Sequence, residues 1–172
     1  MFIAKNNDLI ISAKDTKEEL EQSLKRMAYT SIEETDTAYI YHNGSYFTQE
    51  ELARLEHERI QKLSVTKSDF FDATIKAFGL DDTDLLPIVA SIIAQVEVPE
   101  VMKKIALNNF KNAKDFYRNH EIFNIIAGQP IVVNDDLTIT ITSEQFDRYF
   151  DKASQHDPEA YKELLPIMST EV

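Results

Sequence analysis

The sequence contains no cysteine among its 172 residues. Disulfide scaffolds, thiolate zinc sites, iron–sulfur clusters and cysteine nucleophiles are therefore excluded. A chain without cysteine also suits a reducing compartment, in which disulfides have no use.

Glycine and histidine are also scarce, and neither forms a recognisable motif. The three glycines, Gly44, Gly79 and Gly128, lie too far apart in sequence for a phosphate-binding loop or a dinucleotide fingerprint. The four histidines fall in four different predicted elements, and no His-Glu-x-x-His motif occurs. We therefore expect no cofactor, no metal site and no catalytic site.

Long apolar runs are absent as well. The longest nearly apolar stretch, residues 85–96, is too short to span a bilayer, and the first eight residues lack the basic and apolar regions of a signal peptide. We expect a cytoplasmic protein without membrane association.

The composition is that of a folded acidic protein. An apolar fraction of 43%, with ten Phe and seven Tyr, can supply a substantial core. The net charge of −12 disfavours direct nucleic-acid binding, because Lys and Arg supply most of the affinity for phosphates. The charge is patterned: residues 81–100 contain no basic residue, whereas residues 101–128 contain five basic and two acidic residues.

Residues 1–47 predict a small mixed α/β unit. Apolar runs at 2–4 and 9–11 flank an Asn/Asp turn and predict a hairpin, and Thr16 with Glu19 begins a predicted helix over 16–28. Strands are expected at 31–34 and 38–42, and Asn43-Gly44 is a strong type I′ turn signal.

Residues 48–172 predict a mainly helical domain with one hairpin. Thr48 with Glu51, and Thr142 with Gln145, form capping-box patterns, and Gly79 suits a left-handed helix end. Residues 85–96 predict a central helix buried on several sides, opened by Asp82 or Thr83 and with Pro87 in its first turn; a pair of buried strands is the alternative. Apolar spacing predicts a helix over 99–118 and a turn at 122–126. The packed stripe of the 99–118 helix is expected to hold Met102, Ile105, Ala106, Phe110, Ala113, Phe116 and Tyr117. Residues 131–141 predict the hairpin, and Asp157-Pro158 opens the last predicted helix. The fold class is therefore α+β, with the N-terminal unit packed on the helical part.

Two charged clusters are candidate partner-binding sites. The acidic candidates are Asp81, Asp82, Asp84, Asp135 and Asp136, although helix and turn chemistry also explains carboxylates at these places. The basic candidates lie on one face of the 99–118 helix: Lys103, Lys104, Lys111, Lys114 and Arg118. This face could bind an anionic partner, or it could pair with the acidic segments of the protein itself or of a second copy.

One set of carboxylates could support catalysis. Glu144, Asp147 and Asp151 share one face of a predicted helix and could imitate the paired carboxylates of a glycosidase or nuclease. Surface helices commonly carry such acidic triplets, so we expect a noncatalytic protein.

Residues 38–51, an aromatic hairpin capped into a charged helix, and the segment 63–71 resemble small proteins encoded in phage and prophage tail regions. The resemblance covers roughly residues 35–80. It implies a bacterial host cell and a role as assembly chaperone, structural accessory or inhibitor of host defence. Our leading hypothesis is a noncatalytic accessory protein that binds another protein and can also form a homo-oligomer. The alternative is an acidic nucleic-acid mimic that inhibits a host defence nuclease, as anti-CRISPR proteins do.

Overall fold

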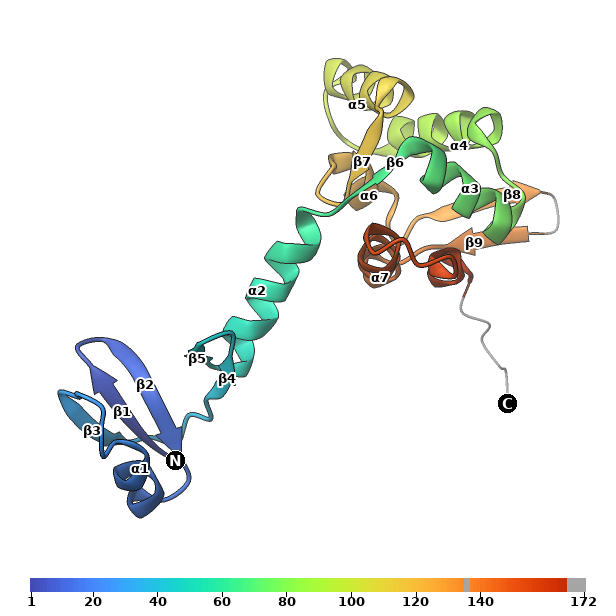
Figure 1. Cartoon of the computed structure of the whole chain (residues 1–172). Helices are drawn as coiled ribbons and strands as arrows, with labels where there is room; N and C mark the ends of the chain where they lie inside the picture. Colours follow the sequence, from blue (N-terminus) through green and yellow to red (C-terminus); the bar gives the residue numbers. More distant parts are fainter. Residues whose placement is uncertain (135–136, 167–172) are drawn as a thin grey trace, which may run out of the picture. The chain divides into compact units, whose positions relative to one another are not determined.

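The computed structural model describes residues 1–134 and 137–166 and has an α+β fold, which confirms the predicted fold class (Figure 1). The chain divides into two compact units, Met1–Glu58 (unit 1) and Arg59–Val172 (unit 2). The sequence predicts a boundary between Phe47 and Thr48, just before a helix begins. In the structure the division of the chain falls inside that helix, after Glu58.

Unit 1 contains a three-stranded antiparallel sheet of order β2-β1-β3, one short helix and a separate hairpin. The elements are β1 (Phe2–Asn6), β2 (Leu9–Lys14), α1 (Lys17–Ser23), β3 (Ser31–Glu34), β4 (Ile40–His42) and β5 (Ser45–Phe47). The predicted order of hairpin, helix and hairpin is confirmed. Its core is small: Ala4, Leu20 and Leu24 are buried together, with Phe2, Ile11 and Ile32 packed against them.

Helix α1 is shorter than the predicted span of 16–28. The Thr16 side chain caps its N-terminus by accepting a hydrogen bond from the backbone N–H of Glu19. The helix ends at Ser23, whose hydroxyl donates to the Leu20 carbonyl at 2.8 Å. Serine at this position competes for backbone hydrogen bonds and so favours an early end.

Helix α2 (Gln49–Gln61) begins with the predicted capping box. The Thr48 hydroxyl accepts from the Glu51 N–H at 3.1 Å, and the Glu51 carboxylate accepts from the Thr48 N–H at 2.8 Å. These hydrogen bonds lower the pKa of Glu51. No residue of α2 is buried.

Unit 2 is mainly helical (Figure 1). Its elements are β6 (Ser64–Thr66), α3 (Lys67–Phe78), α4 (Asp82–Gln95), α5 (Glu100–Asn112), β7 (Asp115–Tyr117), α6 (Glu121–Ile126), β8 (Pro130–Asn134), β9 (Leu137–Thr140), α7 (Ser143–Ser154) and the 3₁₀ helix η1 (Ala160–Leu164). The predicted β8–β9 hairpin, the left-handed conformation of Gly79 and the Thr142 capping box of α7 are all confirmed.

The helix predicted over 99–118 is wrong over its last six residues, 113–118. Helix α5 ends at Asn112, and the chain then forms β7, which pairs antiparallel with β6. The central partners in this ladder, Val65 and Phe116, are both buried. Burial of this distant pair outweighs the local helical spacing, and a three-residue strand is too short to show a period of its own.

The segment 85–96 is helical, so the alternative of two buried strands is wrong. Helix α4 begins at Asp82, which places Pro87 one turn further inside the helix than expected. One face is buried, through Leu85, Val89, Ile92 and Ile93, rather than several sides. Residues 122–126, predicted as a turn, lie in α6, and the last predicted helix is the 3₁₀ helix η1.

Aromatic rings fill the centre of unit 2. Phe123 is fully buried, and its ring centroid lies 5.0 Å from that of Phe150, 5.3 Å from that of Phe146 and 5.5 Å from that of Phe70. These edge-to-face contacts join α3, α6 and α7 around one ring. Phe110 and Phe116 stack beside them at 5.1 Å.

Candidate protein-binding surfaces

The β4–β5 hairpin exposes large apolar side chains. Its strands pair with Ile40 opposite Phe47 and Tyr41 opposite Tyr46, and the connecting turn has positive φ at both Asn43 and Gly44. This is the type I′ geometry that the Asn-Gly pair predicts. The Tyr41 and Tyr46 ring centroids are 5.1 Å apart, yet Tyr41 remains 64% exposed and Ile40 45% exposed. Because neighbouring strand residues point to opposite faces, Tyr41 and Tyr46 share one face of the hairpin and Ile40 lies on the other. We call these three residues, which cover both faces of the hairpin, the hairpin surface.

The rest of unit 1 covers this surface only in part: β5, which carries Tyr46, lies against β2, whereas Ile40 and Tyr41 remain exposed. Only four hydrophobic residues of unit 1 are buried, whereas six large hydrophobic residues are exposed. Unit 2 shows the opposite balance in its described residues, with 22 buried and seven exposed. Exposed aromatic and aliphatic groups on a thin core are typical of surfaces that become buried against a partner.

The hairpin surface lies in an acidic part of the chain. Residues 33–58 contain seven acidic residues and one basic residue, whereas residues 1–32 contain five of each. Glu33 forms an ion pair with Lys5 at 2.7 Å, and the hydrogen bond from this ammonium group lowers the pKa of Glu33. Glu34 and Asp36, just before the hairpin, are exposed.

The five basic candidate residues do not share one helix face. Lys103 is largely satisfied within unit 2, because its ammonium group lies 3.1 Å from Glu100 and donates to the Ala94 carbonyl at 2.8 Å. Lys114 lies beyond the end of α5 and is exposed. Only Lys104 and Lys111 lie exposed on the same row of α5, seven residues apart, which is two helical turns.

Arg118, expected on the exposed basic face, is instead buried, with 1% of its side chain exposed. Its Nε lies 2.6 Å from the carboxylate of Asp147, its Nη1 donates to Asn124 at 3.1 Å, and its Nη2 donates to the Ser143 hydroxyl at 2.6 Å. Arg118 therefore joins β7, α6 and α7 and is not available to a partner. Strand β7 turns this residue inward, which no helical projection of 99–118 could show.

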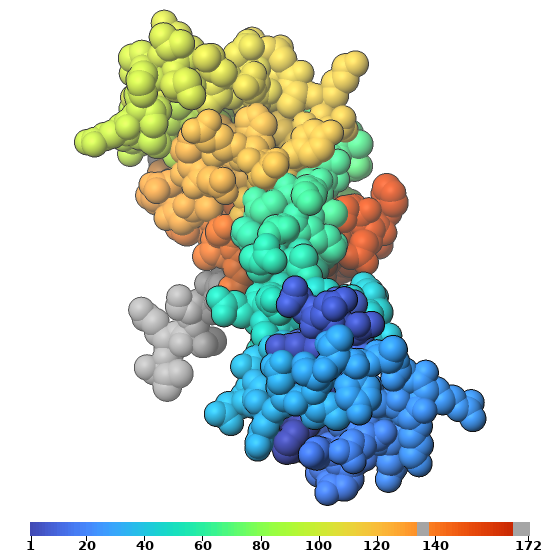
Figure 2. Space-filling view, turned by 90° about the vertical axis from the view of Figure 1, so that its left-hand side faces the viewer, coloured from blue at the N-terminus to red at the C-terminus, as the bar shows by residue number. Residues whose placement is uncertain are grey.

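Helix α5 also exposes apolar side chains, and two of them, Met102 and Ile105, were expected on its packed stripe. Ala106 and Phe110 are buried, but Val101 is 67%, Met102 46% and Ile105 48% exposed. Figure 2 shows α5, coloured yellow, at the surface of unit 2. We call Val101, Met102, Ile105, Lys104 and Lys111 the α5 surface.

The acidic candidates Asp81, Asp82 and Asp84 are exposed and form the start of α4. The helix is capped by Asp81, not by Asp82 or Thr83: its carboxylate accepts from the Thr83 hydroxyl at 2.6 Å and from two backbone N–H groups. The Thr83 hydroxyl and these N–H groups hold the pKa of Asp81 below its usual value. Asp135 and Asp136 lie outside the described residues.

Each carboxylate of the possible catalytic triplet contacts a different arginine. Glu144 lies 2.8 Å from Arg148, Asp147 lies 2.6 Å from Arg118, and Asp151 lies 2.6 Å from Arg59. Of the three, only Asp147 pairs with a buried arginine, so its carboxylate has a structural role in unit 2, whereas the Glu144 pair is exposed.

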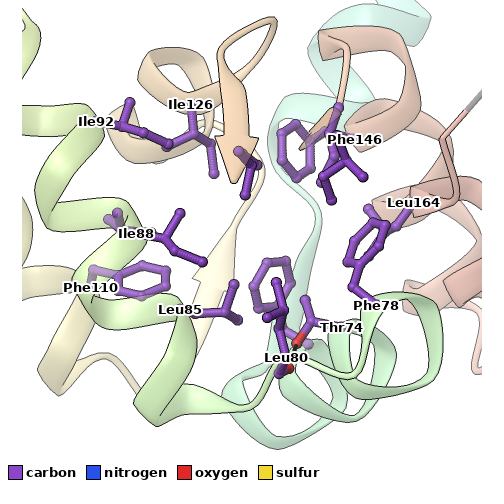
Figure 3. A pocket seen from close by; sticks show the side chains of 15 residues that line it. Thr74, Phe78, Leu80, Leu85, Ile88, Ile92, Phe110, Ile126, Phe146 and Leu164 are labelled. Carbon is purple, nitrogen blue, oxygen red and sulfur yellow. Dashed lines mark hydrogen bonds between the residues drawn. The ribbon is translucent and has the colours of Figure 1, made fainter. Parts of the chain in front are cut away.

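Unit 2 contains an apolar hollow and a polar hollow that are candidate ligand sites. The first, of about 30 Å³, lies between α3, α4 and α7 and is lined by side chains such as Leu85, Ile92 and Phe146 (Figure 3). It has room for about one water molecule, and hollows with apolar walls stay empty. We interpret it as a packing defect, since ligand pockets commonly exceed about 300 Å³.

The second hollow, of about 230 Å³, is polar and lies beside α3, α7 and η1. Its wall includes Asp69, Asp72 and His156, and the Lys76 ammonium group lies 5.8 Å from the centre of the Tyr161 ring. The buried Tyr149 hydroxyl donates to the Asp69 carbonyl at 3.4 Å, and burial raises the pKa of Tyr149 well above its ordinary value. The Lys76 ammonium group, the Tyr149 hydroxyl and the Asp69 carboxylate thus have partners within the unit.

Comparisons with protein-family models, with curated proteins and with solved structures gave no match. No known relative therefore suggests a function for this chain. Among residues 1–134 and 137–166, no cluster of three His, Asp or Glu side chains is arranged to hold a metal ion. Across the same residues, every helix is too short or too polar to cross a bilayer.

The sequence analysis located the β4–β5 hairpin but assigned no role to Ile40 and Tyr41. The Asn43-Gly44 signal fixes where the chain turns, whereas exposure depends on what packs against the strands. The sequence signal that could have predicted this exposure was a run of aromatic residues in a short hairpin, within a segment that has few core residues.

Proposed function

We propose that this protein acts without catalysis, by binding another protein through the hairpin surface. The observation that carries the proposal is the exposure of Ile40 and Tyr41 on a unit with only four buried hydrophobic residues. Tyrosine is among the residues that contribute most to protein interfaces, because its ring buries a large area with little loss of conformational freedom. A two-residue turn also holds the hairpin in a defined shape before binding.

The biological setting that we propose is a phage or prophage accessory role, in assembly or as a chaperone. The resemblance of residues 38–51 and 63–71 to phage tail-region proteins supports it. The hairpin surface lies within the first of these segments.

Site-specific photocrosslinking tests the proposal. A photoreactive benzophenone amino acid in place of Tyr41 is expected to crosslink one protein in producing cells in a fixed ratio. The same group in place of Glu18, an exposed residue of α1, serves as the control in the same unit. Ile40→Ser in the same chain should reduce the crosslink at position 41 by about tenfold or more, as expected for a hot-spot contact. Equal products from positions 41 and 18 would contradict the proposal.

A second candidate function is mimicry of nucleic acid by the carboxylates at the start of α4. The exposure of Asp81, Asp82 and Asp84 supports it, since closely spaced surface carboxylates can imitate phosphates. Binding to a defence nuclease would then weaken steeply as salt is raised. Neutralising Asp82, which accepts no cap hydrogen bond, together with Asp135 and Asp136, should weaken it further. Binding that is unchanged by either treatment excludes the mimic.

A further inference from the structure

The chain carries two exposed apolar surfaces of opposite charge. The hairpin surface lies in residues 33–58, which contain seven acidic residues and one basic residue. The α5 surface lies on α5, which contains three lysines and one acidic residue, Glu100, whose carboxylate pairs with Lys103. One surface belongs to unit 1 and the other to unit 2.

The α5 surface has an apolar stripe with a basic edge. Val101, Met102 and Ile105 are neighbours on the exposed side of the helix. Val101 lies four residues and Met102 three residues before Ile105, and residues at these spacings lie on the same side of an α-helix. Lys104 and Lys111 form a row along one edge of this stripe. The opposite side of α5 is anchored in the core by Ala106 and Phe110. The surface is thus held by a packed helix and does not need to form on binding.

The two surfaces match each other in chemistry. Tyr41 and Tyr46 offer an aromatic face, and Ile40 offers an aliphatic anchor on the other face of the hairpin. Val101, Met102 and Ile105 offer an apolar face with an adaptable methionine. Glu34 and Asp36 precede the hairpin, and Lys104 and Lys111 border the α5 stripe, so opposite charges can surround the apolar contact.

Charge also decides how two copies can meet. Two hairpin surfaces facing each other across a twofold axis would bring two acidic segments together, and two α5 surfaces would bring two basic ones together. Both symmetric arrangements place like charges across the contact, which costs free energy. Only a pairing of unlike surfaces brings opposite charges together. The net charge of −12 opposes association over long distances, but at physiological salt it is screened beyond about 8 Å.

We propose that the α5 surface is a docking site for the hairpin surface of a second copy of this chain. The contact is head-to-tail, so an open chain of copies has one unused hairpin surface at one end and one unused α5 surface at the other. Successive copies therefore extend the chain or close into a ring. This inference rests on the proposed role of the hairpin surface in binding protein, and it names the partner.

Sedimentation velocity of the purified full-length protein over a wide concentration range tests the inference. The mean size is expected to grow with concentration beyond a dimer. Two variants should remain monomeric: the α5 variant Lys104→Glu/Lys111→Glu and the hairpin variant Ile40→Ser/Tyr41→Ser. Their association constants should fall by about tenfold or more. The matched control Lys17→Glu/Lys25→Glu makes the same charge change on exposed residues of unit 1 and should assemble like the wild type.

Mixing the two monomeric variants gives the decisive measurement. Each keeps one intact surface, so the mixture should form a one-to-one dimer that grows no further. Adding Glu34→Lys/Asp36→Lys to an otherwise intact hairpin surface should restore binding to the α5 variant by exchanging the charges. Thermal unfolding of each variant checks that the fold is retained, since all substituted side chains are exposed.

A protein that stays monomeric at all concentrations overturns the inference, as does a dimer that survives both sets of substitutions. Neither result decides the proposed function, because crosslinking at position 41 could still capture a different protein. Conversely, failure to crosslink at position 41 with any protein, including a second copy, would overturn both.

Discussion

Replacing Phe123 by Ala is expected to lower the free energy of unfolding of unit 2 by about 4 kcal/mol. The Phe123 ring is fully buried and contacts four other phenylalanine rings, contributed by α3, β7 and α7. The substitution removes these contacts and leaves a cavity at the point where these elements meet. Surrounding rings cannot collapse fully into it, because Phe70, Phe116 and Phe150 are each held by further aromatic neighbours.

Chemical denaturation, followed by circular dichroism, measures this effect. The control Phe123→Leu keeps most of the apolar volume and should cost clearly less than the Ala variant. Phe78→Ala, on the less buried side of the same core, should also cost less. An Ala variant within about 1 kcal/mol of the wild type would show that Phe123 is not the centre of the core.

Replacing Asp147 by Ala is expected to lower the free energy of unfolding by about 3 kcal/mol. Arg118 is buried, and Asp147 provides the ion pair that compensates its charge, at 2.6 Å. Without that carboxylate the guanidinium group keeps its hydrogen bonds to Asn124 and Ser143 but loses its counter-charge. A buried charge without a partner costs more than the ion pair itself contributes.

A double-mutant cycle with Arg118→Met isolates the ion pair. Met retains the apolar stem and removes both the charge and its need for a partner, so the two losses should not add. We expect a coupling free energy of about 2 kcal/mol. Glu144→Ala, which removes an exposed partner of Arg148, is the matched control and should change stability little. Strict additivity of the two single substitutions would contradict a coupled role.

The Phe123 prediction also concerns function, because the α5 surface depends on the core beneath it. Phe110 anchors α5 and stacks with Phe116, which in turn contacts Phe123. Loss of this core should therefore remove the docking surface. By contrast, Lys104→Glu/Lys111→Glu should reverse the charge of the α5 surface and leave the free energy of unfolding unchanged. The two kinds of variant therefore distinguish a loss of binding from a loss of folding.

Local signals in the sequence determined much of the secondary structure. Asn43-Gly44 specifies a two-residue hairpin, because both positions require a positive φ that these residues tolerate. Thr48 with Glu51, and Thr142 with Gln145, determine where α2 and α7 begin, since each pair satisfies backbone N–H groups that a helix start leaves free. The absence of cysteine likewise excludes disulfides, thiolate metal sites and cysteine nucleophiles from the sequence alone.

Only the tertiary structure decided which side chains remain for a partner. Helical spacing placed Arg118 with Lys104 and Lys111, but pairing of β7 with β6 ends the helix and turns Arg118 toward Asp147. The same spacing placed Met102 and Ile105 on a packed stripe, whereas the core reaches only as far around α5 as Ala106 and Phe110. A hairpin signal fixes Ile40 and Tyr41 in a strand but not what covers them. Exposure depends on contacts between residues far apart in sequence, and local pattern contains no record of those contacts.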